Sequence, residues 1–129
     1  MAAFHFKYQT IEDIKGQIKK NTEKEYSLIL KEIERVKEEI NSLKKQIEET
    51  YELKHNMNAK ELIFLNQYRE TLKNKILQKE EITGSLELKK KEKLEELTRH
   101  HQEHKVFEKL HEKHREDFKV DEASDQAGA

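Results

Sequence analysis

The chain has 129 residues, 41% of them charged and only 33% hydrophobic, with three glycines and neither proline nor cysteine. So few hydrophobic side chains cannot fill an ordinary globular core, but they suffice for long helices that meet along a narrow apolar seam, and the lack of cysteine excludes disulfides and thiolate metal sites. The 26 basic and 27 acidic side chains are interleaved and give a net charge of −1, which argues against nucleic-acid binding.

The opening segment, residues 1–9, has no signal-peptide pattern, and no later apolar run approaches the length of a membrane span. We therefore expect a soluble cytoplasmic protein. Aromatic and polar residues alternate in this segment as they would in a strand, but a helical chain offers no partner strand. We predict an extended lead-in whose aromatic side chains cover the far helix near Phe107 and Leu110. The aromatic residues of the lead-in are Phe4, Phe6 and Tyr8.

Residues 10–54 carry apolar side chains in alternating steps of three and four, which predicts a coiled-coil helix with a heptad seam. Thr10 fits an N-cap for this helix. Ile18 and Tyr26 are eight residues apart rather than seven, so we expect the apolar stripe to drift between them. The seam positions are Ile11, Ile14, Ile18, Tyr26, Ile29, Ile33, Val36, Ile40, Leu43 and Ile47.

A second helix is predicted over residues 59–120, with Asn58 as its N-cap and Glu61 completing a capping box. Its register runs without a break through Gly84, and Ile82 and Leu94 are expected to supplement it from the sides. The register positions are Leu62, Leu65, Arg69, Leu72, Ile76, Lys79, Thr83, Leu86, Lys90, Lys93, Leu97, His100, His104, Phe107, His111, His114 and Phe118.

The short link at residues 55–58 makes the two helices antiparallel neighbours. The sequence therefore predicts an all-α fold in which two long helices form an antiparallel coiled-coil hairpin. Residues 121–129 are small, polar and acidic, and we predict a flexible tail there.

Histidines gather near the end of the second helix, at positions 100, 101, 104, 111 and 114. Spacings of three and four place His100, His101 and His104 on one helix face, but two or three imidazoles fall short of a structural zinc site. We interpret His100, His104, His111 and His114 as seam residues at a polar, loosely packed end of the helix, and keep a metal-binding cluster as an alternative. No phosphate loop and no nucleophile with a plausible partner is present, so we expect neither catalysis, nor a cofactor, nor a metal.

Three segments, in their order and spacing, resemble the flagellar export protein FliJ family. They are the aromatic-basic lead-in at 4–11, the stretch at 61–72 that contains Tyr68 and Leu72, and the stretch at 103–118 that ends on Phe118. The tail departs from the family, whose members commonly extend the second helix further.

The resemblance implies a non-enzymatic component of the flagellar type III export apparatus, similar to the coiled-coil stalk of rotary ATPases. Its implied partners are the hexameric export ATPase, the cytoplasmic part of the membrane export gate, and export chaperones. Its implied location is cytoplasmic, peripherally associated with the inner membrane at the flagellar basal body. The family's gate-contacting surface falls on Tyr68, Leu72, Lys75 and Lys79.

We expect the ATPase ring to contact the end of the molecule where Phe107, Leu110 and Phe118 meet the lead-in, because a stalk enters its ring end-on. Tyr68 is expected to be the exposed anchor of the gate surface, since Leu72 lies on the seam. The alternative is a self-associating coiled-coil spacer or scaffold without an ATPase partner. A homodimer is compatible with either function.

Overall fold

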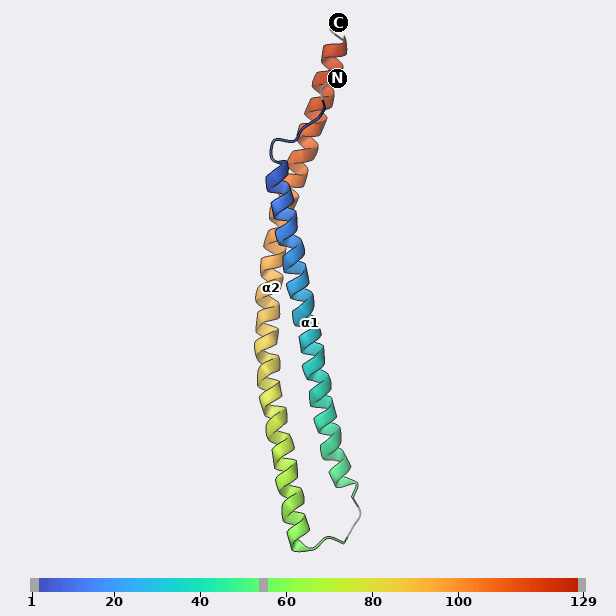
Figure 1. Cartoon of the computed structure of the whole chain (residues 1–129), viewed down its shortest axis with the longest axis vertical. Helices are drawn as coiled ribbons and strands as arrows, with labels where there is room; N and C mark the ends of the chain where they lie inside the picture. Colours follow the sequence, from blue (N-terminus) through green and yellow to red (C-terminus); the bar gives the residue numbers. More distant parts are fainter. Residues whose placement is uncertain (1–2, 54–55, 128–129) are drawn as a thin grey trace. The chain divides into compact units, whose positions relative to one another are not determined.

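The computed structural model describes residues 3–53 and 56–127 of the chain. These residues form two helices, α1 (Gln9–Tyr51) and α2 (Ala59–Ala127), and no strand (Figure 1). The chain divides into two units. The link unit is Ser27–Glu92, and the terminal unit combines Met1–Tyr26 with Lys93–Ala129. In each unit a segment of α1 packs against a segment of α2, which confirms the all-α fold of two paired helices.

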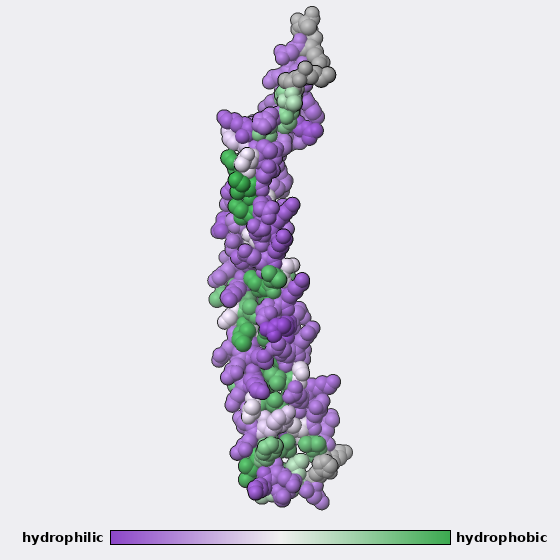
Figure 2. Space-filling view, viewed as in Figure 1, coloured by the Kyte–Doolittle hydropathy of each residue, from purple (hydrophilic) through white to green (hydrophobic). Residues whose placement is uncertain are grey.

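The core of the link unit is a narrow apolar seam. Val36, Ile40 and Ile76 are buried together, as expected for side chains that recur every three or four residues on facing helices. Three partly buried side chains pack against them, namely Leu43, Ile47 and Leu86. Figure 2 shows that hydrophilic residues cover most of the visible face, and that hydrophobic ones form only separate patches.

Contacts across the link unit show that its two helix segments are antiparallel. Thr50, near the end of α1, accepts a hydrogen bond from Arg69, and Glu39 accepts one from Lys79. Further back along α1, Lys37 pairs with Glu87. As positions on α1 decrease, their partners on α2 increase, as a short link between helices requires.

The terminal unit pairs its helix segments in the same antiparallel sense but with polar side chains. Lys93 donates to Glu25 at 2.7 Å, and Lys15 donates to Glu103 at 3.1 Å. Thr22 is buried at a seam position, where its hydroxyl donates to the Ile18 carbonyl oxygen. At these seam positions, polar side chains that form ion pairs and hydrogen bonds replace the apolar side chains found in the core of the link unit.

The start of α2 has the predicted N-cap at Asn58, but Glu61 binds the side chain of Asn58 and not its backbone N–H as in a capping box. The Glu61 backbone N–H donates to the Asn58 side-chain oxygen at 2.8 Å, and the Asn58 amide donates to the Glu61 carboxylate at 3.3 Å. Asn58 thereby satisfies one of the N–H groups that a helix start leaves free. The predicted link at 55–58 includes His55, which lies outside the described residues.

The other helix ends differ from the prediction. Helix α1 begins at Gln9, so Thr10 lies inside the first turn and is not the N-cap. The helix ends at Tyr51 and not at residue 54. Helix α2 continues past residue 120 to Ala127, where we had predicted a flexible tail, because Glu, Gln and Ala in that stretch are good helix formers and neither proline nor glycine interrupts it.

The register of α2 agrees with the prediction at every position from Leu65 to Phe118, each of which is buried or half-buried, whereas Leu62 is exposed. The supplementary positions Ile82 and Leu94 are also exposed, so that prediction was wrong. They sit beside the seam at flanking heptad positions, where the partner helix covers only part of a side chain.

The predicted seam of α1 is wrong in its first turns. Ile11 and Ile14 are exposed, Ile14 by 54%, and Thr22 and Lys15 face the partner helix instead. Counting back from Tyr26 in steps of four, three and four reaches Thr22, Lys19 and then Lys15, so the heptad continues without drift. Ile11 and Ile14 therefore lie outside the heptad positions that face α2, although both are apolar.

Candidate partner-binding surfaces

The predicted gate surface lies on α2 in the link unit, and only part of it is accessible. Leu72 is 3% exposed and belongs to the seam. Lys79 is partly buried and donates to Glu39 at 2.5 Å. Tyr68 is 42% exposed, and Lys75 is also exposed. The structure therefore leaves Tyr68 and Lys75 free to meet a partner, while Leu72 and Lys79 hold the helices together.

Electrostatics strengthen the contact between Lys79 and Glu39. The hydrogen bond from Lys79 holds the pKa of Glu39 below its ordinary value, and the nearby Arg35 guanidinium lowers it further. Arg35 also pairs with Glu32, which lowers the pKa of that carboxyl group. Opposite charges three and four residues apart on a helix support each other in this way. A partner that recruited Lys79 would have to break this network.

Arg69 of α2 caps the C-terminal end of α1. Its guanidinium donates to the Thr50 hydroxyl at 2.7 Å and to the Thr50 carbonyl oxygen at 3.0 Å. It also lies 3.8 Å from the centre of the Tyr51 ring, in cation–π geometry. The last turn of α1 has no basic residue of its own, so Arg69 supplies the cation that a helix C-terminus favours. The heptad register placed Arg69 on the seam but did not reveal this capping role.

The predicted ring surface lies in the terminal unit, where the lead-in packs onto α2. Phe107, Leu110 and Phe118 are each half-buried. Tyr8 and Phe107 approach edge to face at 6.5 Å between ring centres, and Phe4 lies 5.5 Å from Phe118. The prediction that the lead-in covers the far helix near Phe107 is confirmed.

Phe6 is the centre of this aromatic cluster and is 3% exposed. Its ring stacks on His111 with centres 4.4 Å apart and planes inclined by 5°, and it meets His114 edge to face at 5.4 Å. His111 has a second partner, because its Nδ1 lies 2.7 Å from the Glu12 carboxylate. Sequence reasoning placed His111 on the seam but missed both partners.

Two other seam histidines, His100 and His104, also lie close to carboxylates. His104 lies 2.9 Å from Glu108, and His100 lies within 3.7 Å of both Glu96 and Glu103. Gly16 has no side chain, which lets the His104 ring pack directly against α1. In the part of the chain that the structure describes, no three histidine or acidic side chains converge as metal ligands would, so the geometry gives no support to a metal-binding cluster.

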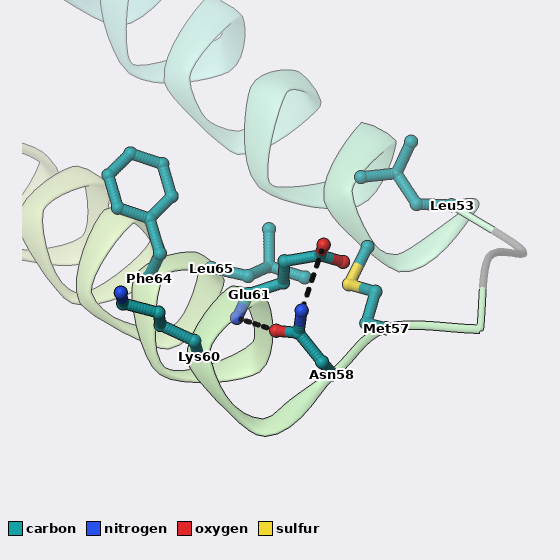
Figure 3. A pocket seen from close by; sticks show the side chains of 7 residues that line it. All are labelled: Leu53, Met57, Asn58, Lys60, Glu61, Phe64 and Leu65. Carbon is teal, nitrogen blue, oxygen red and sulfur yellow. Dashed lines mark hydrogen bonds between the residues drawn. The ribbon is translucent and has the colours of Figure 1, made fainter.

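A third accessible surface lies beside the start of α2 and was not predicted. Here an apolar hollow of about 600 Å³ opens beside the start of α2 (Figure 3). We call it the link hollow. It is lined by Leu53, Met57, Asn58, Lys60, Glu61, Phe64 and Leu65. The sequence signal was the apolar run Leu62–Leu65, since four consecutive residues point around a whole helix and cannot all face one seam.

Comparison with known proteins identifies the family. Residues 4–126 match the family model FliJ, described as "Flagellar FliJ protein". Searches of the curated proteins and of the solved structures found no match. Neither helix, as far as the structure describes them, has a stretch long and apolar enough to cross a membrane. Because the match spans nearly the whole chain, the resemblance seen in the sequence is confirmed, and the chain belongs to the flagellar FliJ family, a family of non-catalytic flagellar export components.

Proposed function

We propose that this protein is a non-enzymatic coiled-coil stalk of the flagellar export apparatus, which promotes assembly of the export-ATPase ring and links the ring to the membrane export gate. The observation that carries the proposal is the family match over residues 4–126. The paired helices support it, because a coiled coil can present partner-binding side chains at both of its ends without enclosing a catalytic pocket.

The ring contact is assigned to the terminal unit, at the aromatic cluster that contains Phe107 and Phe118, together with Leu110 one helical turn after Phe107. These side chains are half-buried, so each keeps part of its apolar surface available to a partner. Aromatic side chains of this kind dominate many protein interfaces. Phe6 and His111 fix the cluster by stacking, which lowers the entropy cost of binding because the rings are already ordered.

The gate contact is assigned to the accessible part of the α2 surface in the link unit. Tyr68 provides an exposed aromatic ring and Lys75 an exposed cation. Leu72 and Lys79, which the family resemblance also brought to this surface, act through the fold by holding α2 against α1. Export chaperones are further partners, and the protein works in the cytoplasm beside the inner membrane at the basal body.

The mechanism of ring assembly is thermodynamic linkage. A protein that binds the assembled ring but not its free subunits shifts the equilibrium toward the ring. The increase in ATPase activity should therefore be large when subunits are dilute and should fade when they assemble unaided.

An ATPase assay over a range of subunit concentrations, with and without this protein, tests the proposal. Tyr68→Ala should leave the stimulation intact and weaken binding to the purified cytoplasmic part of the gate. Stimulation that is independent of subunit concentration would contradict the assembly mechanism. Absence of stimulation at all concentrations would favour the alternative, a self-associating scaffold, for which exposed apolar side chains such as Leu77 and Leu88 would provide contacts.

A further inference from the structure

The link hollow is an apolar surface that the fold leaves open. Phe64 lines it and is 72% exposed, more than any other large hydrophobic side chain that the structure describes. Figure 3 shows Phe64 on one side of the hollow, and Leu53 and Met57 on the other. A monomeric protein rarely gathers exposed apolar side chains around one hollow unless something binds there.

The lining also contains two charged residues of opposite sign. Lys60 and Glu61 are both exposed, and neither forms an ion pair among the described residues. The Glu61 carboxylate accepts a hydrogen bond from the Asn58 amide at 3.3 Å, which leaves its charge unbalanced. The hollow therefore presents one cation and one anion to a partner, and its lining has no net charge.

The charged and apolar residues of the lining follow a symmetric order along the chain. Lys60 and Glu61 hold the centre, and Met57 and Phe64 lie three residues to either side of them. In chain order the pattern is apolar, basic, acidic, apolar. Reversing the chain direction exchanges the two charges and leaves an apolar side chain at each end.

A two-fold symmetric contact between two copies of the chain brings a pattern against its own reverse. In such a contact, if one residue meets a second residue of the other copy, the second also meets the first. When the two α2 starts lie antiparallel, Lys60 of each copy faces Glu61 of the other, and Phe64 faces Met57. Opposite charges then meet twice, and so do an aromatic ring and a thioether, both of which are favourable contacts.

The size and charge of the hollow suit this occupant. A volume of about 600 Å³ lies in the range that holds a whole small ligand, so it accepts the ring of Phe64 from a second copy. A strongly charged occupant, such as an anionic membrane surface, fits less well. One of the two lining charges would always face a charge of its own sign, which is unfavourable.

We infer that the link hollow is a self-association surface, through which two copies of the chain form a two-fold symmetric dimer. The Phe64 ring of each copy enters the hollow of the other, and Lys60 pairs with Glu61 across the symmetry axis. The contact is confined to the start of α2 in each copy, so the interface is small and the dissociation constant should be on the order of 10–100 µM. The inference does not depend on the stalk proposal.

Sedimentation velocity of the full chain tests the inference. Between about 1 µM and about 1 mM the unmodified chain should pass from monomer to dimer. Phe64→Ser should raise the dissociation constant about tenfold or more, as loss of an aromatic anchor does at interfaces. Leu88→Ser, at a side chain of α2 that is 59% exposed outside the hollow, should change it less than about twofold. Circular dichroism checks that both variants keep their helices.

The charges at the centre allow a test specific to the symmetric arrangement. Lys60→Glu or Glu61→Lys alone places like charges opposite each other at both central contacts. Each variant should raise the dissociation constant about tenfold or more at low salt, where exposed charges are least screened. An equal mixture of the two variants restores opposite charges at both contacts, so these variants should associate with each other.

The double variant, Lys60→Glu with Glu61→Lys, is the control for the helix start. It exchanges the two charges within one chain and should dimerise again. A gain of this kind shows that the single change at Glu61 did not act by disturbing the first turn of α2.

Four outcomes would overturn the inference. One is a chain that stays monomeric up to about 1 mM, and a second is a loss of association in Leu88→Ser as large as in Phe64→Ser. A third is failure of the two charge variants to associate when mixed, although the unmodified chain dimerises. The fourth is a monomeric chain that binds phosphatidylglycerol vesicles through Phe64. None of these assays contains the ATPase, so their results are separate from those that test the stalk proposal.

Discussion

The link unit and the terminal unit join the same two helices by different means. In the link unit the seam is apolar and centres on Val36, Ile40 and Ile76. In the terminal unit several of the corresponding positions hold charged residues or histidines, such as Lys15, Lys93 and His104, and an aromatic lead-in anchored by Phe6 packs onto α2. Burial of apolar surface needs only the correct register, whereas polar seam positions each need a specific partner. A heptad pattern can therefore continue where its hydrophobicity does not.

The largest expected effect is in the link unit. Ile40→Asp places a carboxylate in the buried seam and should lower the free energy of unfolding by about 3 kcal/mol or more. Leu88→Asp, at a side chain that is 59% exposed, should change it by less than about 0.5 kcal/mol. Thermal melts followed by circular dichroism compare the two. Equal melting temperatures would mean that the register is wrong.

The terminal unit should be most sensitive to its aromatic anchor. Phe6→Ala removes a buried ring from the stack on His111 and should cost about 2–3 kcal/mol. His5→Ala, at an exposed neighbour in the same segment, serves as the control. Urea denaturation gives the free energies, and amide hydrogen exchange shows whether the loss is confined to this unit. A Phe6→Ala variant as stable as His5→Ala would show that the lead-in contributes little.

One helical glycine in each unit allows a direct comparison, because replacing it with alanine should change the free energy of unfolding by about 1 kcal/mol or less. Gly84→Ala should stabilise the protein by about 0.5–1 kcal/mol, because the added methyl group meets no atom within 4 Å and alanine favours the helix. Gly16→Ala should gain less, since its Cβ would lie 3.0 Å from Nε2 of His104. Paired thermal melts measure both changes. An equal gain at the two positions would show that the His104 ring yields without cost.

The smallest expected effect is the loss of stability of the terminal unit at acidic pH. The hydrogen bond from Lys15 holds the pKa of Glu103 below its ordinary value. A lowered pKa in the folded state means that the stabilising contribution is present above the ordinary glutamate pKa and is lost as the pH falls through the lowered value. Both groups are partly exposed, so the change should be modest.

Glu103→Gln should make the stability of the terminal unit less dependent on pH. Amide hydrogen exchange in this unit, compared between neutral and acidic pH, measures the change. Glu112→Gln is the control for the loss of an exposed carboxylate on the same helix that does not pair with Lys15. An unchanged pH profile in Glu103→Gln would show that the pair with Lys15 contributes nothing to folding.

Sequence reasoning worked best where one local rule decided the outcome. The N-cap at Asn58 depends on a backbone N–H only three residues away, at Glu61, and it formed as predicted. The register of α2 held from Leu65 onward because any departure would expose the whole seam. Sequence reasoning failed at Ile11 and Ile14, because these apolar residues of α1 do not lie on the side of the helix that faces α2.

The sequence by itself determined the fold class, the start of α2 and its register, because helix propensity, capping and heptad spacing act over a few residues. Only the tertiary structure decided which side chains pair between the helices. It brought Phe6 onto His111, placed Arg69 at the end of α1, and left Phe64 exposed beside an open hollow. Each of these depends on where two distant segments meet, and spacing within one helix carries no information about the neighbour that a side chain will find there.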